Sequence, residues 1–337
     1  MFNSLQNNPP NRYTRETVEW EGLAPKAKLE VPEDHSRDIL SRNISPGVGF
    51  SCSVNRVSRV HACVQLLLCA AVSQKLELGV GTDFERRILI KPRAVQLLQA
   101  ELDRPRWRGE VIAFSGATDA WQPLERRYEL TRRCLGVCAA YRQPVTVFTR
   151  SPLILRDLDL LTLLADQRAV RVQISIPVLD RNHARVLEPG AAPPELRLSA
   201  LRTLSEAGIP VGVSLAPLIP GLTDSLVPKA LIAAREAGAQ WAFMTLLRLP
   251  GSGATFFEQR LRECLPEQAE KVMNRLNSAA GVTRAGFGQR LKGRGESWNT
   301  IHALFELWKR KLGYDSPRPW PPSSFRRPGQ GEQLALF

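Results

Sequence analysis

Short apolar runs recur along the middle of the chain, and longer amphipathic stretches separate them. The runs span 110–114, 145–148, 170–176, 211–215 and 241–247. Their spacing of roughly 30 residues is typical of βαβ units, in which nearly continuous apolar strands are buried on both faces. The pattern therefore predicts parallel strands joined by helices. The predicted helices lie at 124–141, 155–167, 195–207 and 226–237.

A further strand at 49–55 precedes this series and completes six βα units. Right-handed crossovers place every helix on the outer face of a curved sheet. We therefore predict an α/β fold, a partial (βα)6 TIM-like barrel over 46–314, with an amphipathic helix at 298–311. The polar, proline-containing residues 1–45 are expected to form a partly disordered N-terminal arm, and 315–337 a basic, proline-rich tail.

Composition narrows the class of protein. The chain has 337 residues, of which 43% are hydrophobic, enough for one barrel-sized core. It has no apolar run of about 18 residues and no signal-peptide-like start, so we expect a cytoplasmic protein with no membrane contact. Six cysteines in that reducing compartment do not indicate a disulfide framework. The net charge of +13 fits a polyanionic partner such as nucleic acid and a merely basic surface about equally well.

A family resemblance rests on four segments, at 81–87, 115–119, 149–151 and 216–224. They resemble the radical S-adenosylmethionine superfamily, in its branch related to spore photoproduct lyase. The resemblance extends over about residues 38–314. It implies a [4Fe-4S] cluster that cleaves S-adenosylmethionine and starts radical chemistry by hydrogen abstraction. Lyase-like chemistry on damaged nucleic acid, as in DNA repair, is one form of that chemistry, and it needs an electron donor.

The same resemblance assigns strand-end residues to the nucleoside cofactor. They are Ser115, Thr118, Asp119, Thr149, Arg150, Ser151 and Ser175. The first three would face the amino group and ribose, and the next three the carboxylate. Arg150 stands where family members usually have lysine, which keeps the charge but changes the geometry. Without the resemblance, all of these would be ordinary strand-end turn residues.

The segment 216–224 is similar to the loop that lies against the adenine in this superfamily. By that resemblance, Ile219 would supply an apolar face and Gly221 would let the backbone approach the ring. Asp224 would cap the following helix. Pro217 replaces the first glycine of the family pattern, so a simple connecting loop is the alternative.

Two charged residues between the third and fourth strands are also family-like. Glu188 and Arg197 lie in the segments 187–190 and 193–197. They are expected either to form a structural ion pair or to shape the substrate side of the site.

The cluster ligands are missing where the resemblance requires them. The family pattern begins Asn-Pro-Tyr-Arg-Gly-Cys and continues in C-x3-C-x2-C spacing, whereas 55–63 reads Asn-Arg-Val-Ser-Arg-Val-His-Ala-Cys. Deleting one base from the Arg56 codon of a permitted coding sequence converts this segment to Asn-Pro-Tyr-Arg-Gly-Cys-Met-His-Ala. Continued over 64–74, the new frame can encode Cys-x-Tyr-Cys-Phe-Ala-Arg-Pro-Ser-His, which completes the cysteine spacing. Either the coding record carries two compensating errors, or the gene has decayed.

Three cysteines of the present frame are weak candidate ligands. Cys52, Cys63 and Cys69 are separated by eleven and six positions, which does not match the family spacing. The apolar stretch 64–68 suits a strand or helix better than a cluster loop, and a buried cysteine commonly acts as a small apolar residue. The sequence therefore contains no metal-ligand set with the expected spacing, and no catalytic residue is assigned.

The C-terminus carries a separate signal. The last five residues, 333–337, resemble the bacterial sliding-clamp binding motif, with the partner contacts expected from Gln333, Leu334, Leu336 and Phe337. Large apolar anchors on a flexible tether suit such a peptide ligand. The alternatives are a fortuitous apolar end and a tail that packs on its own barrel.

These observations favour a radical S-adenosylmethionine protein whose activity as an enzyme is open. As written, the chain lacks the C-x3-C-x2-C motif and is expected to be inactive. The competing hypothesis is a non-catalytic protein that binds nucleic acid or the sliding clamp on a degenerate barrel.

Overall fold

A computed structural model describes most of the region predicted to fold. It covers residues 31–35, 37–42, 50–54, 57–58, 89–115, 118–188, 190–247, 249, 252–280, 293–315, 320–321 and 323–329. Within these ranges, no helix is long and apolar enough to cross a membrane.

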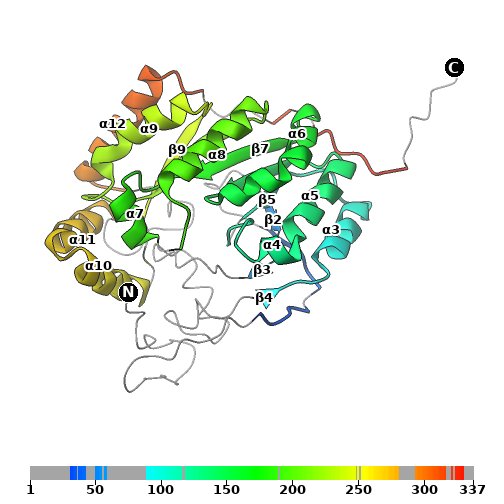
Figure 1. Ribbon diagram of the computed structural model, residues 1–337, viewed down its shortest axis with the longest axis horizontal. Coiled ribbons are helices and arrows are strands. Elements are labelled where there is room, and N and C mark those ends of the chain that lie inside the picture. Colours follow the sequence, from blue (N-terminus) through cyan, green and yellow to red (C-terminus); the bar gives the residue numbers. More distant parts are fainter. Residues whose placement is uncertain are drawn as a thin grey trace.

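The sheet confirms the predicted (βα)6 topology (Figure 1). Its parallel strands lie side by side in chain order. They are β2 (Cys52–Val54), β5 (Ile112–Phe114), β6 (Val145–Thr149), β7 (Val170–Ser175), β8 (Val211–Leu218) and β9 (Ala242–Leu246). One further strand, β1 (Leu40–Arg42), pairs antiparallel with β2 at the edge. Residues 40–42 of the expected N-terminal arm therefore belong to the sheet.

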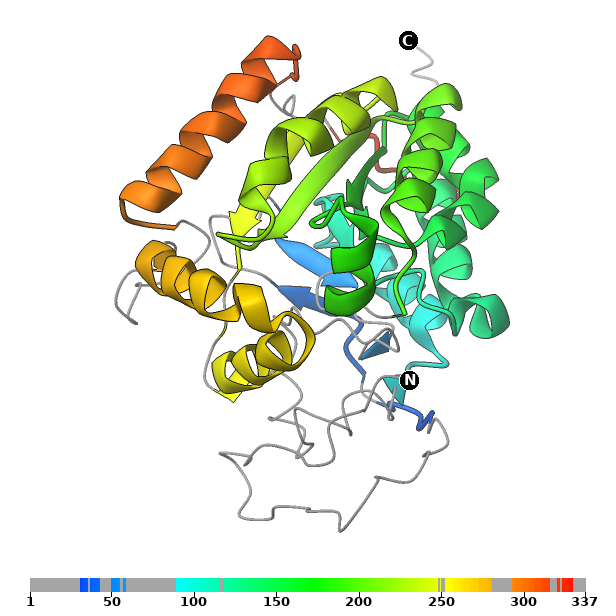
Figure 2. The ribbon, with the colours of Figure 1, turned by 60° about the vertical axis from the view of Figure 1, so that its left-hand side comes forward.

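Helices cover the outer side of the curved sheet, as Figures 1 and 2 show. In chain order they are α3 (Ala94–Asp103), α4 (Glu125–Tyr128), α5 (Leu130–Ala140), α6 (Leu158–Asp166), α8 (Pro194–Glu206) and α9 (Val227–Glu236). The single helix predicted at 124–141 is wrong. Glu129 adopts a left-handed conformation with φ 50°, which separates α4 from α5.

The remaining elements connect or extend these units. They are a two-stranded sheet of β3 (Val57–Ser58) and β4 (Leu89–Ile90), the 3-10 turns η1 (Pro152–Asp157) and η2 (Asp224–Leu226), and the helices α7 (Arg181–Leu187), α10 (Ser252–Cys264), α11 (Pro266–Ala280) and α12 (Glu296–Lys311). Helix α12 lies along α9 in Figure 2 and buries Trp298, Ile301 and Phe305.

The main core lies between the sheet and the outer helices. Strand residues of alternating position, such as Val145 and Val147, are fully buried. Helix residues one turn apart meet them, for example Leu201 and Leu204 in α8. Because each fully buried side chain of this size contributes about 2 kcal/mol, this two-sided burial is the main source of stability.

The inner side of the sheet is filled at its amino end by Trp241. The indole Nε1 donates to Gln173 Oε1 over 3.0 Å, and Gln173 Nε2 donates to the carbonyl of Val213 over 2.8 Å. Gly212 makes room for this ring, because a Cβ there would lie 2.2 Å from the indole nitrogen. The amino end of the barrel is therefore packed, and the opposite end is left for chemistry.

A segment of the predicted tail, residues 323–327, packs across the amino ends of the strands; we call it the strap. Ser323 Oγ donates to the carbonyl of Gly109 over 3.1 Å, just before β5. The backbone amide of Arg326 donates to the carbonyl of Tyr141 over 2.8 Å, just after α5. Phe325 stacks on the Tyr141 ring with 6.2 Å between centroids.

Arg327 of the strap caps the carboxyl end of α3. Its guanidinium donates to the carbonyls of Leu102, Arg104 and Trp107 over 3.2, 2.7 and 3.2 Å. A cation here satisfies carbonyls that the helix leaves unpaired and opposes the negative end of the helix dipole. The tail is thus tied to its own barrel in this segment, which agrees with one of the alternatives predicted from the sequence.

A matched pair of glycine substitutions tests the strap. Gly109 and Gly208 have the same φ of +76°, but an added Cβ would lie 2.4 Å from Phe325 Cβ at Gly109 and meets nothing within 4 Å at Gly208. Gly208→Ala should cost about 1 kcal/mol of unfolding free energy from backbone strain alone. Gly109→Ala should cost about 2 kcal/mol more, because it overpacks the strap contact. Urea unfolding measures both values.

The additional loss of unfolding free energy in Gly109→Ala, relative to Gly208→Ala, should disappear in a chain that ends at residue 315, since the strap is then absent. Equal costs at the two glycines in the full chain would show that the strap does not pack against the barrel as described.

Candidate functional site

Polar residues gather at the carboxyl ends of the parallel strands, which is where the sequence places the candidate site. This edge carries the chemistry in barrels of this kind, because it leaves side chains free of the core. The predicted residues reach it from four strands. Ser115, Thr118 and Asp119 follow β5, Thr149 ends β6 and is followed by Arg150 and Ser151, Ser175 ends β7, and Ile219 and Gly221 follow β8.

Asp119 ties the ends of β5 and β6 together. Its Oδ1 accepts a hydrogen bond from the Thr149 hydroxyl over 2.6 Å, and its Oδ2 accepts one from the Arg150 backbone amide over 2.9 Å. Oδ1 also accepts from the Trp121 backbone amide over 2.9 Å. The carboxylate therefore orders the site, and its acceptor positions are largely used within the protein.

The hydroxyl groups of the site also have local partners. Ser115, which has φ 79°, accepts from the Ala120 amide over 2.7 Å. Ser151 accepts from the Leu153 amide over 3.3 Å and caps η1. Ser175 donates to the carbonyl of Ala216 over 3.2 Å and so joins the ends of β7 and β8. These contacts define the shape of the strand ends. To bind a ligand as well, a serine hydroxyl must use a lone pair that is still free or rotate to another rotamer.

The loop after β8 is tightly folded. Ile219 is fully buried, and its backbone amide donates to Thr223 Oγ1 over 2.9 Å. Gly221 has φ +86°, and an added Cβ would lie 3.1 Å from Arg275 Cδ of α11. The space that this glycine leaves is therefore occupied by α11, and its approach to an adenine ring stays a prediction.

Asp224 does not cap the following helix, so that expectation is wrong. Its Oδ1 accepts a hydrogen bond from the Gly221 amide over 3.0 Å, and its Oδ2 pairs with Arg275 over 3.1 Å. The side chain closes the loop backwards and fastens it to α11. An aspartate can do this as readily as it can cap a helix, so the sequence alone does not separate the two roles.

Three phenylalanine rings meet inside the barrel, and the sequence patterns did not single them out. Phe148 of β6 lies 6.5 Å from Phe243 of β9 and 5.8 Å from Phe50, measured between ring centroids. Strands β6 and β9 are separated by β7 and β8 in the sheet, so the rings can meet only across its concave side. The only sequence signal is that Phe148 directly precedes Thr149 and so points to the opposite face of β6. Together the rings form an apolar layer below the polar strand ends.

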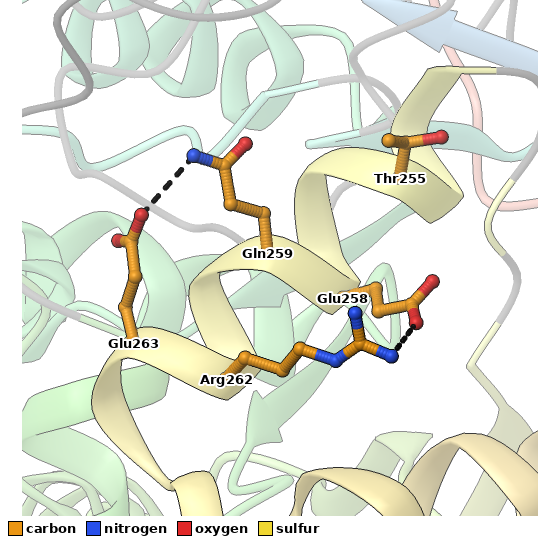
Figure 3. Close-up of a pocket in the computed structure, with 5 residues that line it drawn as sticks. All are labelled: Thr255, Glu258, Gln259, Arg262 and Glu263. Atoms are coloured by element: carbon orange, nitrogen blue, oxygen red, sulfur yellow. Dashed lines mark hydrogen bonds and ion pairs between the residues drawn. The ribbon is translucent and has the colours of Figure 1, made fainter.

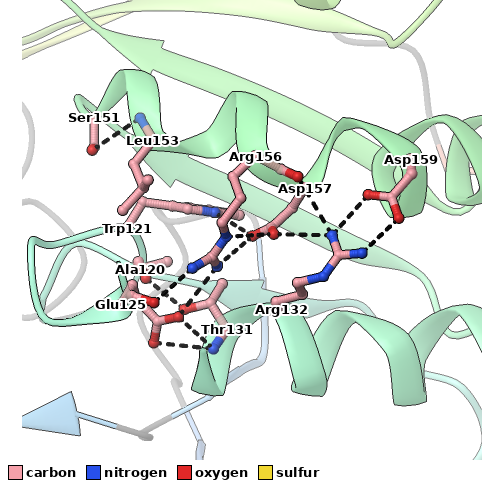
Figure 4. Close-up of polar contacts among 10 residues, drawn as sticks. All are labelled: Ala120, Trp121, Glu125, Thr131, Arg132, Ser151, Leu153, Arg156, Asp157 and Asp159. Carbon is pink, nitrogen blue, oxygen red and sulfur yellow. Dashed lines mark hydrogen bonds and ion pairs between the residues drawn. The ribbon is translucent and has the colours of Figure 1, made fainter. Parts of the chain in front are cut away.

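A buried ionic network supports the loops outside β5 and β6, as Figure 4 shows. Asp157 is fully buried and accepts hydrogen bonds from Trp121 Nε1 over 2.7 Å, Arg156 Nε over 2.8 Å and Arg132 Nη1 over 3.2 Å. Arg132 also makes a bidentate contact with the exposed Asp159, at 2.8 and 2.7 Å, which lowers the pKa of Asp159 to about 2. The bidentate contact therefore keeps its charge in mildly acidic solution.

A second ionic cluster lies directly at the strand ends. Arg150 Nη1 lies 2.7 Å from Glu188 Oε1, and Arg197 Nη1 lies 2.8 Å from Glu188 Oε2. The predicted Glu188–Arg197 ion pair is therefore present, although Nη1 of Arg197 has hydrogen-bond geometry only toward the carbonyl of Ser175, at 3.2 Å. Burial, together with the positive charge of Arg150, lowers the pKa of Arg197, while Glu188 opposes that shift.

Cys52 does not suit a cluster ligand. It lies at the amino end of β2, where it pairs in register with Ile112, and its thiol donates to the Glu110 carboxylate over 3.5 Å. Burial and that carboxylate raise the pKa of the Cys52 thiol, which disfavours the thiolate that binds iron. Cys63 and Cys69 lie outside the described residues. Within the described ranges, no group of three or more His, Cys, Asp or Glu side chains could hold a metal ion.

A hollow of about 370 Å³ lies along the outer face of α10, apart from the strand ends. Figure 3 shows that its labelled lining side chains all come from this helix. Arg262 pairs with Glu258 over 2.6 Å, and Gln259 donates to Glu263 over 3.1 Å. None of the candidate cofactor residues borders this hollow, so we place the site at the strand ends.

Comparison with known proteins gives a family match for part of the chain. Residues 69–232 match the model of the radical SAM superfamily. An uncharacterised protein of Mycobacterium tuberculosis is 34% identical over 209 residues, which make up 61% of each chain. An uncharacterised protein of Acidianus two-tailed virus is 35% identical over 183 residues, 54% of this chain and 57% of its own. The chain thus spans about three fifths of the length of these relatives.

Solved structures of spore photoproduct lyase share the fold. A mutant with bound S-adenosylmethionine and dinucleoside spore photoproduct has a TM-score of 0.60 at 12% identity, over 84% of this chain and 79% of that chain. A complex with dinucleoside spore photoproduct has a TM-score of 0.59 at 13% identity, with the same coverage.

Replacing Asp119 tests its role in ordering the strand ends. Asp119→Ala should lower the free energy of unfolding by about 2 to 3 kcal/mol, because it leaves the Thr149 hydroxyl and two backbone amides without their acceptor. Asp166→Ala, at the exposed end of α6, is the control and should stay within about 0.5 kcal/mol. A loss at Asp119 no larger than at Asp166, measured by urea unfolding, would contradict the ordering role.

Proposed function

Because residues 69–232 match the model of the radical S-adenosylmethionine superfamily, we propose that this chain binds S-adenosylmethionine across the carboxyl ends of β5 to β8. The cofactors of this superfamily are S-adenosylmethionine and a [4Fe-4S] cluster. One observation carries the proposal. The partly exposed Arg150 and the ordered polar loops lie at the strand ends, directly above the apolar layer of Phe50, Phe148 and Phe243. A nucleoside that carries an amino acid needs such a combination of charge, hydrogen-bonding groups and apolar surface.

The residues present fit the nucleoside better than they fit the cluster. Arg150 has a guanidinium that the carboxylate of the amino-acid part can pair with. Ser115, Thr118 and Asp119 border the place proposed for its ribose and amino group, and Ile219 with Gly221 the place proposed for its adenine. The phenylalanine layer excludes water from the space beside them. When bound, the cluster supplies the electron that starts radical chemistry.

The cluster segment is the incomplete part of the proposal. Residues 59–88 lie outside the described residues, and 55–63 as written lacks the cysteine motif. We infer that the gene encodes that motif between codons 56 and 74 in a shifted reading frame. The present amino-acid sequence is the translation of the neighbouring frame over this segment. In the present frame the protein would be inactive, since three thiolates are needed to hold the cluster.

Reconstitution with iron and sulfide separates the two frames. The protein as written should stay nearly colourless, whereas a frame-corrected protein should turn brown with stoichiometric labile sulfide. On reduction, the corrected protein should convert S-adenosylmethionine to 5′-deoxyadenosine. The matched control carries alanine at the three restored cysteines and should behave like the protein as written. Stoichiometric sulfide in the uncorrected protein would contradict the frame inference, and a corrected protein that forms the cluster without releasing 5′-deoxyadenosine would contradict the proposed chemistry.

Nucleic acid is the substrate class that we propose. The support is the net charge of +13 and the shared fold with spore photoproduct lyase, whose structures contain a dinucleoside lesion. A basic protein that contacts several phosphates binds with steep salt dependence, because each contact releases counterions. Salt-dependent binding of an oligonucleotide therefore distinguishes this proposal from a surface that is basic but has no such partner.

A second candidate function is binding of the bacterial sliding clamp through residues 333–337. These residues lie outside the described ranges, but the strap fixes the point from which they leave. Arg327 is held at the carboxyl end of α3, which lies at the amino ends of the strands and so opposite the candidate site. A partner bound to the last residues would therefore leave the strand ends accessible.

A peptide spanning residues 326–337 tests this candidate. It should bind the β clamp of the same organism with micromolar affinity, about −8 kcal/mol. Replacing Leu336 and Phe337 together by alanine should abolish binding, because large apolar anchors dominate small interfaces. Glu332→Ala lies outside the motif and serves as the control. Calorimetry that detects no heat, together with no competition against a known clamp peptide, would exclude the clamp as partner.

A further inference from the structure

The cluster of Arg150, Glu188 and Arg197 joins three separate segments at one point. Arg150 directly follows β6, Glu188 directly follows α7, and Arg197 lies in the first turn of α8. Their exposures differ sharply. The side chains of Glu188 and Arg197 are 0% and 1% exposed, whereas that of Arg150 is 23% exposed. Only Arg150 reaches from this cluster toward solvent.

Stability alone is a weak reason for this arrangement. Removing three charges from water costs several kcal/mol per ion, and apolar side chains of similar volume often replace such buried clusters without loss of stability. The cluster also carries a surplus positive charge, because two guanidinium groups share one carboxylate. Asp119, the other nearby acid, contacts the backbone amide of Arg150 and not its guanidinium, and its charge acts on Arg197 less than that of Glu188 does. The surplus charge suits an anionic group of a ligand.

The hydrogen bonding leaves donors free for such a group. Arg150 uses one guanidinium nitrogen, Nη1, for Glu188, and among the described residues no other partner of its guanidinium is found. A guanidinium has five donors in a fixed plane, so an arginine held at one nitrogen presents its remaining edge in a defined direction. In addition, Nη2 of the buried Arg197 has no hydrogen-bond partner in the part of the chain that the structure describes.

Lysine would serve differently. An ammonium has three donors on one rotating nitrogen and no fixed plane, so a carboxylate bound to one donor does not set the direction of the others. Arginine separates the two tasks between two edges of one plane. Arg150 and the buried Glu188, 2.7 Å away, therefore act together: the glutamate fixes the guanidinium that the ligand contacts.

We propose that Glu188, held in place by Arg197, is a positioning residue that grips one edge of Arg150 and directs its other edge toward the carboxylate of the ligand. This inference rests on the proposed function, since the ligand is the nucleoside that carries an amino acid. Glu188 itself does not touch the ligand. Its effect on affinity passes through Arg150 and is confined to ligands with a carboxylate.

Two ligands and two substitutions test the proposal without any need for the cluster. S-adenosylhomocysteine carries the amino-acid carboxylate, and 5′-methylthioadenosine lacks the amino-acid part. Glu188→Gln removes the buried charge, and Arg150→Lys keeps the charge but removes the fork. Titration followed by ligand-observed NMR gives the affinities, and thermal unfolding followed by circular dichroism shows whether each variant folds.

Each single substitution should weaken the binding of S-adenosylhomocysteine roughly tenfold or more, because each disturbs a charge-assisted contact. Neither should change the affinity for 5′-methylthioadenosine by more than about twofold. In the Arg150→Lys background, Glu188→Gln should have no further effect on S-adenosylhomocysteine, since both changes act through the same contact. If Glu188→Gln fails to fold, Glu188→Asp carries the test, because it keeps the buried charge but shortens the side chain that reaches Arg150, and it should weaken binding of S-adenosylhomocysteine alone.

Three outcomes would overturn the proposal. Equal binding of S-adenosylhomocysteine by the wild-type protein and by both variants would overturn the positioning role and leave the proposed function standing. Parallel loss of both ligands in a folded variant would show that the cluster shapes the whole site and does not aim one arginine. Failure of the wild-type protein to bind either ligand would overturn the proposed function and this inference with it.

Discussion

A parallel sheet has to bury both of its faces, and the rest of this structure depends on that constraint. The outer helices cover one face with residues such as Leu201 and Leu204, and Trp241 and the three phenylalanines fill the other. Polar side chains in the middle of the strands therefore need partners inside the protein, as Gln173 has in Trp241 and Val213. At the strand ends polar side chains meet loops, so Asp119 contacts the backbone amide of Arg150 and Ser175 contacts the carbonyl of Ala216. The position of the candidate site follows from how the sheet is buried.

Charge at the strand ends then has to be compensated inside the protein. Asp157 is surrounded by donors from three elements, and Glu188 lies between two arginines. Both acids lie below the surface, and both hold loops that follow neighbouring strands. Such clusters depend on accurate geometry, because one missing partner leaves a buried charge unpaired. They make the loops of the site rigid at the point where the backbone would otherwise be free.

The strands and crossover helices could be predicted because their signal is local. The run at 145–148 is apolar at three of its four positions, and β6 forms there with one further residue. The contacts around Asp224 could not be predicted in the same way, because its partner Arg275 is distant in sequence and an aspartate after a strand suits several turns. The meeting of Phe148 with Phe243 depends on the curvature of the sheet, which no single strand encodes. The strap was not predicted for a related reason, since it lies within a basic, proline-rich region whose composition resembles that of an unattached tail.

The strap also bears on how the chain reaches its native state. The bond between Ser323 and Gly109 joins residues that are 214 positions apart, and the cap that Arg327 places on α3 joins residues 225 and 223 positions apart. A ribosome synthesises α3 well before the strap, so during synthesis the amino ends of β5 and β6 lack the cover that the strap gives them. The barrel can form before the strap arrives, because its own contacts are between neighbouring units. Docking of the strap therefore follows formation of the barrel, and a product released before residue 323 would leave the amino ends of β5 and β6 uncovered.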